Sequence, residues 1–348
     1  MNTLKVDITK KLGKITLRSR FEVSGDRFAL LGSSGSGKTM TLKCIAGIEK
    51  PDSGLIALGD KVLFDSSRKI NLPARKRNVG YLFQDYALFP NMTAFDNINI
   101  ISGDRLKTME LLERFNIADI SDHKPSQMSG GQCQRTALAR MIASDPEIIL
   151  LDEPFSALDN YMSTIIEREI MDLLETFDGP SVLVSHDRNE VYRMCDTIGV
   201  MDMGELTEVK PRDEFFDDPT SVVAARLTGC KNISAVDDSG FASDWGIRVT
   251  LPAGSTCRYI GYRAHYLERV GKEMNGEANV FDAKVERVIE DTFETAVCFR
   301  QRDNDSSSTD SLLTWMIRKE DVDEMVKASS SGNLFLKIDP GHLMLLER

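Results

Sequence analysis

The chain contains, at residues 28–39, the run Phe28-Ala29-Leu30-Leu31-Gly32-Ser33-Ser34-Gly35-Ser36-Gly37-Lys38-Thr39. Its glycine-rich part matches the phosphate-binding pattern G-x-x-x-x-G-K-[ST], and its apolar part is the short strand that precedes such a loop. Backbone N–H groups at the glycines can turn toward phosphate oxygens, and the following helix adds partial positive charge at its N-terminus. We expect Lys38 to reach the β- and γ-phosphates of a nucleotide and the Thr39 hydroxyl to bind Mg²⁺. A Gly- and Ser-rich surface turn is the alternative interpretation.

Apolar runs and helical patterns alternate on either side of this loop. Residues 38–48 have the apolar spacing of a helix, while residues 148–151 and 181–185 are continuous apolar runs of strand length. Continuous apolar strands separated by helices are typical of a parallel sheet that is covered on both faces. Residues 91–145 are helical in pattern with few turns, which indicates a helical subdomain inserted into this α/β domain.

A pair of carboxylates follows one of the predicted strands. Asp152 and Glu153 come directly after the apolar residues 148–151, and Pro154 follows them. Beside a phosphate-binding loop, Asp152 is placed to hold Mg²⁺ through water, and Glu153 is placed to polarise an attacking water molecule. The alternative is an acidic pair at a strand end that only faces solvent.

Further short motifs make a resemblance to a known family specific. They are Gln84 in Phe83-Gln84-Asp85, the signature Met128-Ser129-Gly130-Gly131-Gln132, the segment Ser156-Ala157-Leu158-Asp159, and His186 after an apolar strand. In order and spacing they resemble the Q-loop, the L-S-G-G-Q signature, the D-loop and the switch histidine of the ATP-binding-cassette (ABC) ATPases. The resemblance covers roughly residues 1–228 and implies a P-loop ABC ATPase domain of the α/β class.

The resemblance also implies a mechanism that needs two copies of the chain. In that family two ATPase domains meet head to tail, and the signature of one chain caps the γ-phosphate held by the other. The residues that would do so here are Ser129, Gly130, Gly131 and Gln132. The implied cofactors are ATP and Mg²⁺, with Thr39, Gln84 and Asp152 around the metal, and the implied catalytic residues are Glu153, His186 and Gln84.

The segment Phe83–Pro90 resembles the part of importer ATPases that grips a short helix of the membrane subunit. Tyr86 and Phe89 are expected to be exposed in this segment, and exposed aromatics suit a groove for a partner helix. The implied partners are two transmembrane permease subunits and, indirectly, a solute-binding protein. The alternative is that both aromatics simply pack the helical subdomain.

The N-terminal stretch departs from the family pattern. Leu12, in Lys10-Lys11-Leu12-Gly13-Lys14, stands where family members usually carry an aromatic residue that stacks on adenine. An apolar contact replaces that stacking, so the sequence does not establish a preference for ATP over GTP.

The character of the chain changes after Gly229. Apolar residues recur with a period of two over residues 246–251, 295–299, 313–317 and 334–338, and a polar hairpin or loop covers residues 301–311. Several short alternating strands in a row indicate a small antiparallel barrel or sandwich. We therefore predict an ATPase domain over residues 1–228 and a small all-β regulatory or dimerisation domain over residues 229–348.

The start of this second domain resembles the regulatory barrels of solute importers. Leu227-Thr228-Gly229-Cys230-Lys231-Asn232 is similar to the beginning of molybdate-binding barrels, and residues 260–265 are similar to a further element there. In those barrels backbone N–H groups, hydroxyls and a cation hold a tetrahedral oxyanion. The candidate residues here are Thr228, Cys230, Lys231 and Asn232. The alternative is that Lys231-Asn232 is a domain-entry turn and that the barrel only dimerises.

Composition limits the class of protein. The chain has 348 residues and a net charge of −11, which disfavours nucleic acid as a partner. No run approaches the roughly 20 apolar residues of a membrane span, and residues 1–14 are too charged for a secretory signal. We expect the chain at the cytoplasmic face of the cell membrane, with the spans supplied by a partner. The six widely spaced cysteines are interpreted as reduced thiols rather than as a disulfide framework or zinc site.

These features predict the ATPase subunit of a solute importer, and the resemblance favours molybdate or tungstate as the solute. Oxyanion bound to the C-terminal domain would then inhibit transport. Importers for sulfate, ferric iron, phosphonate or sugar are the rivals within this class. The rivals outside it are a soluble cassette ATPase that acts on nucleic acid or ribosomes and a protein that only stores or senses oxyanion.

Overall fold

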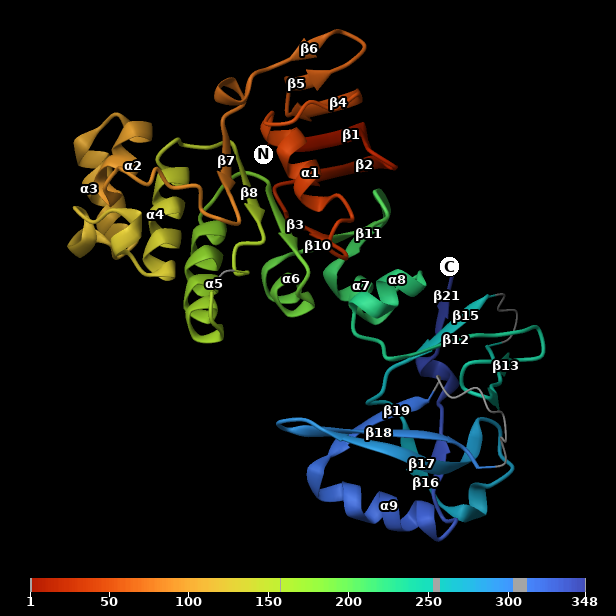
Figure 1. Ribbon diagram of the computed structural model, residues 1–348. Helices are drawn as coiled ribbons and strands as arrows, with labels where there is room; N and C mark the ends of the chain where they lie inside the picture. The colour runs from red at the N-terminus through yellow and green to blue at the C-terminus, as the bar shows by residue number, and fades with distance from the viewer. Residues whose placement is uncertain (1, 157, 253–256, 303–311, 348) are drawn as a thin grey trace. The chain divides into compact units, whose positions relative to one another are not determined.

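The computed structural model describes residues 2–156, 158–252, 257–302 and 312–347. The chain divides into two compact units, Met1–Arg212 and Asp213–Arg348 (Figure 1). The division falls at the start of helix α7 (Arg212–Asp217) and before α8 (Val222–Leu227), earlier than the predicted boundary between residues 228 and 229. One reason is that the backbone N–H of Val222, at the start of α8, donates to the carbonyl of Glu347 near the C-terminus (3.0 Å).

The first unit is built on one sheet of eleven strands. In spatial order they are β6 (Ile70–Asn71), β5 (Lys61–Asp65), β4 (Ser53–Leu58), β1 (Thr3–Leu12), β2 (Ile15–Ser24), β11 (Glu205–Pro211), β10 (Thr197–Asp202), β3 (Arg27–Leu31), β9 (Ser181–Ser185), β8 (Ile148–Asp152) and β7 (Val79–Leu82). The strands from β10 to β7 are parallel neighbours, whereas those from β6 to β2 pair antiparallel. The predicted α/β class with a parallel central sheet is confirmed.

The parallel strands are buried because their sequence is almost unbroken in its apolar character. All five residues of β8 and all five of β9 are buried. Helix α1 (Lys38–Ala46) packs on β8 and β9, and α6 (Arg188–Met194) packs on β3 and β9. Leu31 pairs with Ser185, and Asp152 pairs with Val184. The carboxyl ends of β3, β9 and β8 therefore lie side by side, and the loops that follow them meet at one edge of the sheet.

A helical subdomain interrupts this unit in the stretch where the sequence predicted one. It contains α2 (Ala94–Ser102), α3 (Arg105–Arg114) and α4 (Gly130–Ile142), which gather beside β7 in Figure 1. Each helix begins with a side-chain cap, from Thr93, Asp104 and Ser129 respectively. Such caps accept hydrogen bonds from first-turn N–H groups that have no partner within the helix.

The described part of the second unit contains three sheets. The first holds β12 (Asn232–Ala235), β15 (Tyr259–Tyr262) and β21 (Met344–Leu346), and the second holds β13 (Phe241–Ala242) and β14 (Ile247–Arg248). The third holds β16 (Glu268–Val270), β20 (Phe335–Lys337), β17 (Val280–Glu290), β18 (Glu294–Gln301) and β19 (Leu313–Arg318). The predicted small β domain is thus confirmed, although the strand expected over residues 246–251 is shorter and spans Ile247–Arg248. Of the loop predicted at 301–311, residues 303–311 lie outside the described residues.

The second unit also holds a helix that the sequence analysis did not predict. Helix α9 (Val322–Ser330) packs against β17 and buries Met325 and Ala328. In the described residues of both units, no helix is long and apolar enough to cross a bilayer. All six cysteines are free thiols in the structure.

Candidate active site

The phosphate-binding loop connects the end of β3 to the start of α1. The Lys38 side chain is buried, and its Nζ donates to the carbonyls of Gly32 (2.8 Å) and Ser33 (2.9 Å) in the same loop. Burial lowers the pKa of Lys38, while the carboxylates of Glu153 and Asp152 act in the opposite direction. The ammonium group therefore lies folded over the loop.

The glycines of this loop are required by its geometry. Gly37 has a φ of 108° and precedes α1 without giving it a side-chain cap. A Cβ at Gly37 would lie 2.8 Å from Leu17 Cδ1, and one at Gly32 would lie 2.2 Å from the carbonyl oxygen of Met201. The buried Ser36 hydroxyl has no hydrogen-bond partner among the described residues. An uncapped helix N-terminus beside an unsatisfied hydroxyl suits an anion, so the loop fits a nucleotide phosphate.

The loop reaches the acidic pair through Thr39. The Thr39 hydroxyl donates to Oδ1 of the buried Asp152 (2.7 Å), and the Tyr81 hydroxyl donates to its Oδ2 (2.8 Å). Burial and the nearby Asp152 raise the pKa of Tyr81, so this hydroxyl stays protonated. The contact with Tyr81 was not predicted, because Tyr81 and Asp152 lie on neighbouring strands far apart in the sequence.

Hydroxyl and carboxylate oxygens are the ligands that Mg²⁺ prefers, and Mg²⁺ is usually shared between one or two carboxylates, waters and substrate phosphates. Thr39 and Asp152 fit that pattern. Among the described residues, no group of three or more His, Cys, Asp or Glu side chains is arranged to hold a metal by itself. Gln84, the third predicted ligand, lies just after β7 with an exposed side chain.

Glu153 and His186 come together at the same edge of the sheet. His186 Nδ1 lies 3.6 Å from Glu153 Oε2, and the His186 side chain is 64% exposed. Glu153 has a φ of 45°, which is strained for a residue other than glycine. Its backbone N–H donates to the carbonyl of Val184 (3.0 Å), which holds the turn in place.

A second, unpredicted network supports the His186 loop. The Ser185 hydroxyl donates to Glu190 Oε2 (2.5 Å) and accepts a hydrogen bond from the backbone N–H of Asp187 (2.9 Å). Burial raises the pKa of Glu190. Since Ser185 and Asp187 flank His186, these bonds fix the backbone on both sides of the histidine.

The signature residues lie in the helical subdomain, at the start of α4. Ser129 and Gln132 form a reciprocal capping box, in which each side chain accepts a hydrogen bond from the other's backbone N–H (3.3 and 2.8 Å). Ser129 and Gly130 are exposed, while Gly131 is buried against Met162, whose Cε would lie 2.3 Å from an added Cβ. Of the predicted D-loop, Ala157 lies outside the described residues.

The segment after β7 differs from the prediction in the exposure of Tyr86. Tyr86 is only 8% exposed, and its hydroxyl lies 3.5 Å from Oε1 of Gln134 on α4. The predicted exposure of Tyr86 is therefore wrong, because its ring packs into the helical subdomain. Phe89 is 43% exposed, as expected. Arg140 donates to the carbonyls of Tyr86 and Ala87 (2.8 Å each), and its guanidinium lies 5.5 Å from the Phe89 ring centre.

A groove of about 330 Å³ runs beside this segment. The residues that line it include Val79, Tyr81, Phe83, Phe89, Ile101 and Arg140. Most are apolar or aromatic, so the groove suits the apolar face of a short helix.

Comparisons with known proteins agree with this geometry. Residues 20–156 match the family model described as ABC transporter. The chain is 34% identical over 261 residues to the trehalose/maltose import ATP-binding protein MalK of Thermococcus litoralis, covering 71% of this chain and 70% of that protein. The chain belongs to the ABC transporter ATPases of importer type. It is an ATPase that binds ATP and couples its hydrolysis to transport.

The names of other relatives specify different solutes. The chain is 34% identical over 274 residues to the molybdenum import ATP-binding protein ModC of Paramagnetospirillum magneticum, covering 73% of this chain and 76% of that protein. It is 40% identical over 210 residues to the sulfate/thiosulfate import ATP-binding protein CysA of Brucella melitensis, covering 57% of each. A solved ATP-binding cassette, a dimer bound to ADP and Pi in a post-hydrolysis state, has a TM-score of 0.52 at 28% identity, covering 61% of this chain and 99% of that one.

In this ABC ATPase, the donors of the predicted oxyanion segment, residues 228–232, form hydrogen bonds with other parts of the fold. The Thr228 hydroxyl and the Cys230 N–H both donate to the carbonyl of Ala225 (2.8 and 3.0 Å). The buried Asn232 amide donates to the carbonyl of Thr314 and accepts from its N–H (2.8 and 2.7 Å). Lys231 is exposed, with Nζ 3.5 Å from Met316 Sδ. Within one chain, Thr228, Cys230 and Asn232 therefore donate to the fold itself, and oxyanion binding by this segment stays a prediction.

Leu12, at the position where family members carry an adenine-stacking aromatic, is partly buried and packs against the core of the ATPase unit.

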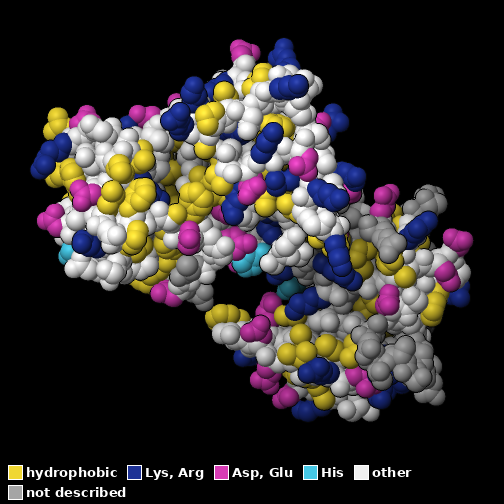
Figure 2. Space-filling view, turned by 45° about the horizontal axis from the view of Figure 1, so that its top comes forward, with side chains coloured by type: hydrophobic (Ala, Val, Ile, Leu, Met, Phe, Trp, Pro, Cys, Tyr) yellow, Lys and Arg dark blue, Asp and Glu magenta, His cyan; other side chains and the backbone are white. Residues whose placement is uncertain are grey.

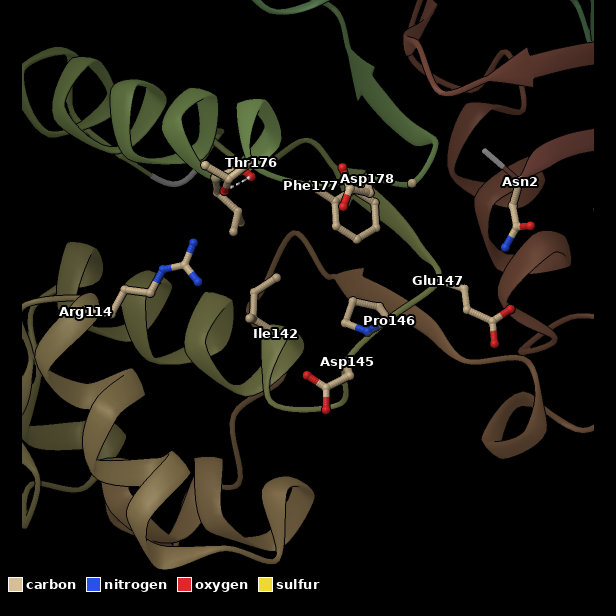
Figure 3. Close-up of a pocket in the computed structure, with 11 residues that line it drawn as sticks. Asn2, Arg114, Ile142, Asp145, Pro146, Glu147, Thr176, Phe177 and Asp178 are labelled. Atoms are coloured by element: carbon tan, nitrogen blue, oxygen red, sulfur yellow. Dashed lines mark hydrogen bonds between the residues drawn. The ribbon is translucent and has the colours of Figure 1, made fainter.

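A further pocket of about 400 Å³ opens elsewhere on the ATPase unit. Figure 3 shows Arg114, Ile142, Pro146 and Phe177 around it, with the carboxylates of Asp145 and Glu147 at its rim. None of its lining residues belongs to the phosphate-binding loop or the acidic pair. Its mixed lining of one cation, several acids and apolar rings indicates no specific ligand.

Proposed function

We propose that the chain hydrolyses ATP as a head-to-tail homodimer docked on two transmembrane permease subunits of a solute importer. The observation that carries this proposal is the meeting of Lys38, Thr39, Asp152, Glu153 and His186 at one sheet edge. The solved relative described as a dimeric cassette bound to ADP and Pi supports the dimer. Such a complex would hold the chain at the cytoplasmic face of the cell membrane.

In this proposal the loop from Gly32 to Thr39 binds the ATP phosphates. Its backbone N–H groups and the N-terminus of α1 stabilise negative charge, and the Lys38 ammonium exchanges the Gly32 and Ser33 carbonyls for phosphate oxygens. Thr39, Asp152 and Gln84 would hold Mg²⁺, which supplies neutralisation of phosphate charge.

Glu153 would orient the attacking water and accept its proton, since it is the carboxylate next to the phosphate-binding loop that is not engaged with Thr39. His186, 3.6 Å from Glu153, would contact the γ-phosphate and help to place that water. Ser129, Gly130, Gly131 and Gln132 would act on the ATP of the partner chain. They begin α4, and a helix N-terminus carries partial positive charge that suits a γ-phosphate.

The substitution Glu153→Gln tests this assignment. It keeps the shape of the side chain but removes the proton acceptor, so ATP hydrolysis should fall at least about 100-fold while ATP binding persists. The uncleaved ATP should then hold two chains together, which size-exclusion chromatography with and without ATP would detect. Glu169→Gln is the matched control, because it makes the same change in a carboxylate paired with Arg135. Normal hydrolysis by Glu153→Gln would remove Glu153 from its role.

For the solute, we propose a tetrahedral oxyanion, with molybdate or tungstate first. Support comes from the similarity to ModC and CysA, whose names specify molybdenum and sulfate/thiosulfate. The similarity to MalK supports a disaccharide as the rival, and ferric iron and phosphonate are further rivals. Cells that lack this chain should lose uptake of labelled molybdate and tungstate but keep uptake of trehalose and maltose. Loss of sugar, sulfate or iron uptake instead would identify a rival solute.

A cassette ATPase that acts on nucleic acid is the alternative from a different class. Such proteins usually present a basic face. Figure 2 shows dark blue and magenta side chains intermixed over the face in view, and the chain as a whole carries a net charge of −11. Co-purification with a membrane subunit, rather than with nucleic acid, would support the importer.

A further inference from the structure

Tyr81 lies between the candidate ATP site and the groove beside β7. Its hydroxyl donates to Asp152 Oδ2 (2.8 Å) in the ATP site. Tyr81 also lines the groove that suits the apolar face of a short helix, which we assign here to a permease subunit, and its ring lies 4.2 Å, centre to centre, from the ring of Phe83 in the same groove. One side chain therefore touches both the candidate metal carboxylate and the candidate docking surface.

The two oxygens of Asp152 are held by different donors. Thr39 donates to Oδ1 (2.7 Å) and Tyr81 to Oδ2. In the proposed mechanism a lone pair of the Thr39 oxygen would bind Mg²⁺, while the Thr39 proton can still be donated to Oδ1 of Asp152. Tyr81 is then the donor that fixes the other oxygen, Oδ2, and with it the orientation of the carboxylate. Its strand β7 pairs with β8 in register, Tyr81 opposite Leu150, so the backbone fixes where the hydroxyl can reach.

We propose that Tyr81 is a positioning residue for Asp152 and that it links the orientation of this carboxylate to occupancy of the groove. A helix seated beside Phe83 and Tyr81 would restrict the tyrosine ring, and the ring would restrict the carboxylate. This inference rests on the proposed role of Asp152 in holding Mg²⁺. It adds a path from the docking surface to the ATP site that bypasses the exposed Gln84.

Nucleotide binding by the full chain tests the positioning role without relying on hydrolysis. ATP affinity is measured by calorimetry in EDTA and then at increasing Mg²⁺. In Tyr81→Phe, the Mg²⁺ concentration for half-maximal effect should rise about 3- to 10-fold, because one hydrogen bond to a charged group is lost. Affinity in EDTA should stay unchanged, which also shows that the variant is folded. Tyr262→Phe is the control, since it removes a buried tyrosine hydroxyl that donates to the carbonyl of Tyr266 in the other unit.

A double-mutant cycle tests the link to the groove. Phe83→Leu removes the ring beside Tyr81 and should raise the same Mg²⁺ concentration about 2- to 3-fold. In the Tyr81→Phe background it should have no added effect, because Phe83 acts through the tyrosine hydroxyl. Fully additive effects would overturn the link and indicate that Phe83 acts through the adjacent Gln84.

Asp152→Asn separates failure of this inference from failure of the proposed function. If Asp152→Asn abolishes the Mg²⁺ effect and Tyr81→Phe leaves it unchanged, Tyr81 has no positioning role and the proposed site stands. If Asp152→Asn also leaves the Mg²⁺ effect unchanged, the metal role of Asp152 is wrong, and the inference about Tyr81 falls with it.

Discussion

The sequence predicts anion sites at two lysine-containing segments, residues 32–39 and residues 228–232. In the structure these segments lie at opposite kinds of helix end. The first segment leads into the N-terminus of α1, which has no side-chain cap. The second follows the C-terminus of α8, where Thr228 is the C-cap. A helix N-terminus carries partial positive charge and a C-terminus partial negative charge. The two segments therefore offer an anion opposite fields, although both contain lysine, hydroxyl and glycine residues.

The donors of the two segments also differ in what they bind. Lys38 donates to carbonyls of its own loop, which a phosphate can replace without disturbing the rest of the fold. Asn232 and Cys230 bond to β19 and α8, so releasing them would break the second unit. A donor-rich motif thus becomes a ligand site only where its donors are not already needed to hold the fold together.

Replacing Lys38 should produce the largest effect. Lys38→Ala removes the buried cation of the phosphate loop, so ATP hydrolysis should fall about 100- to 1000-fold, as for loss of one charge-stabilising donor. A steady-state ATPase assay measures this. Lys43→Ala, in the last turn of the same helix α1, is the control for loss of one positive charge. Equal losses of hydrolysis in the two variants would mean that Lys38 contributes only to the net charge of the helix. Residues 32–39 would then not differ from residues 228–232 as an anion site.

Replacing Asn232 should affect stability and leave hydrolysis unchanged. Asn232→Ala deletes both hydrogen bonds to the Thr314 backbone at a buried site, which should lower the unfolding free energy of the second unit by about 2 kcal/mol. Urea unfolding, followed as separate transitions of the two units, measures it. ATP hydrolysis in native buffer should not change. Lost hydrolysis with unchanged unfolding would show that Asn232 serves a ligand after all.

The ATPase unit could be predicted from the sequence because its motifs are local. Strands β3, β8 and β9 were predicted because each is a continuous apolar run, and the loop and acidic pair follow directly from those strands. Their meeting at one edge requires only that the strands be parallel neighbours. The same reasoning brings His186 to Glu153, because the histidine follows β9.

The missed features depend on contacts between distant segments. Tyr81 reaches Asp152 only through the register of β7 with β8, and Tyr86 is buried only because α4 packs over it. No local pattern specifies either contact.

Helix α9 is different, since Val322, Met325 and Val326 follow the acidic residue Asp321 at helical spacing. This local pattern predicts the helix, although alternating strands flank it on both sides.

Replacing Lys231 should produce the smallest effect. Its ammonium is exposed, and Thr228, Cys230 and Asn232 donate within the fold, so Lys231→Ala should change neither ATP hydrolysis nor stability measurably. Calorimetric titration with molybdate, tungstate, sulfate and phosphate should give the same heats for Lys231→Ala and the unaltered chain. Tight oxyanion binding that Lys231→Ala abolishes would contradict this, since one chain does not assemble the donors. It would mean that a second copy completes the site, and the contrast with the phosphate loop would then hold only for the single chain.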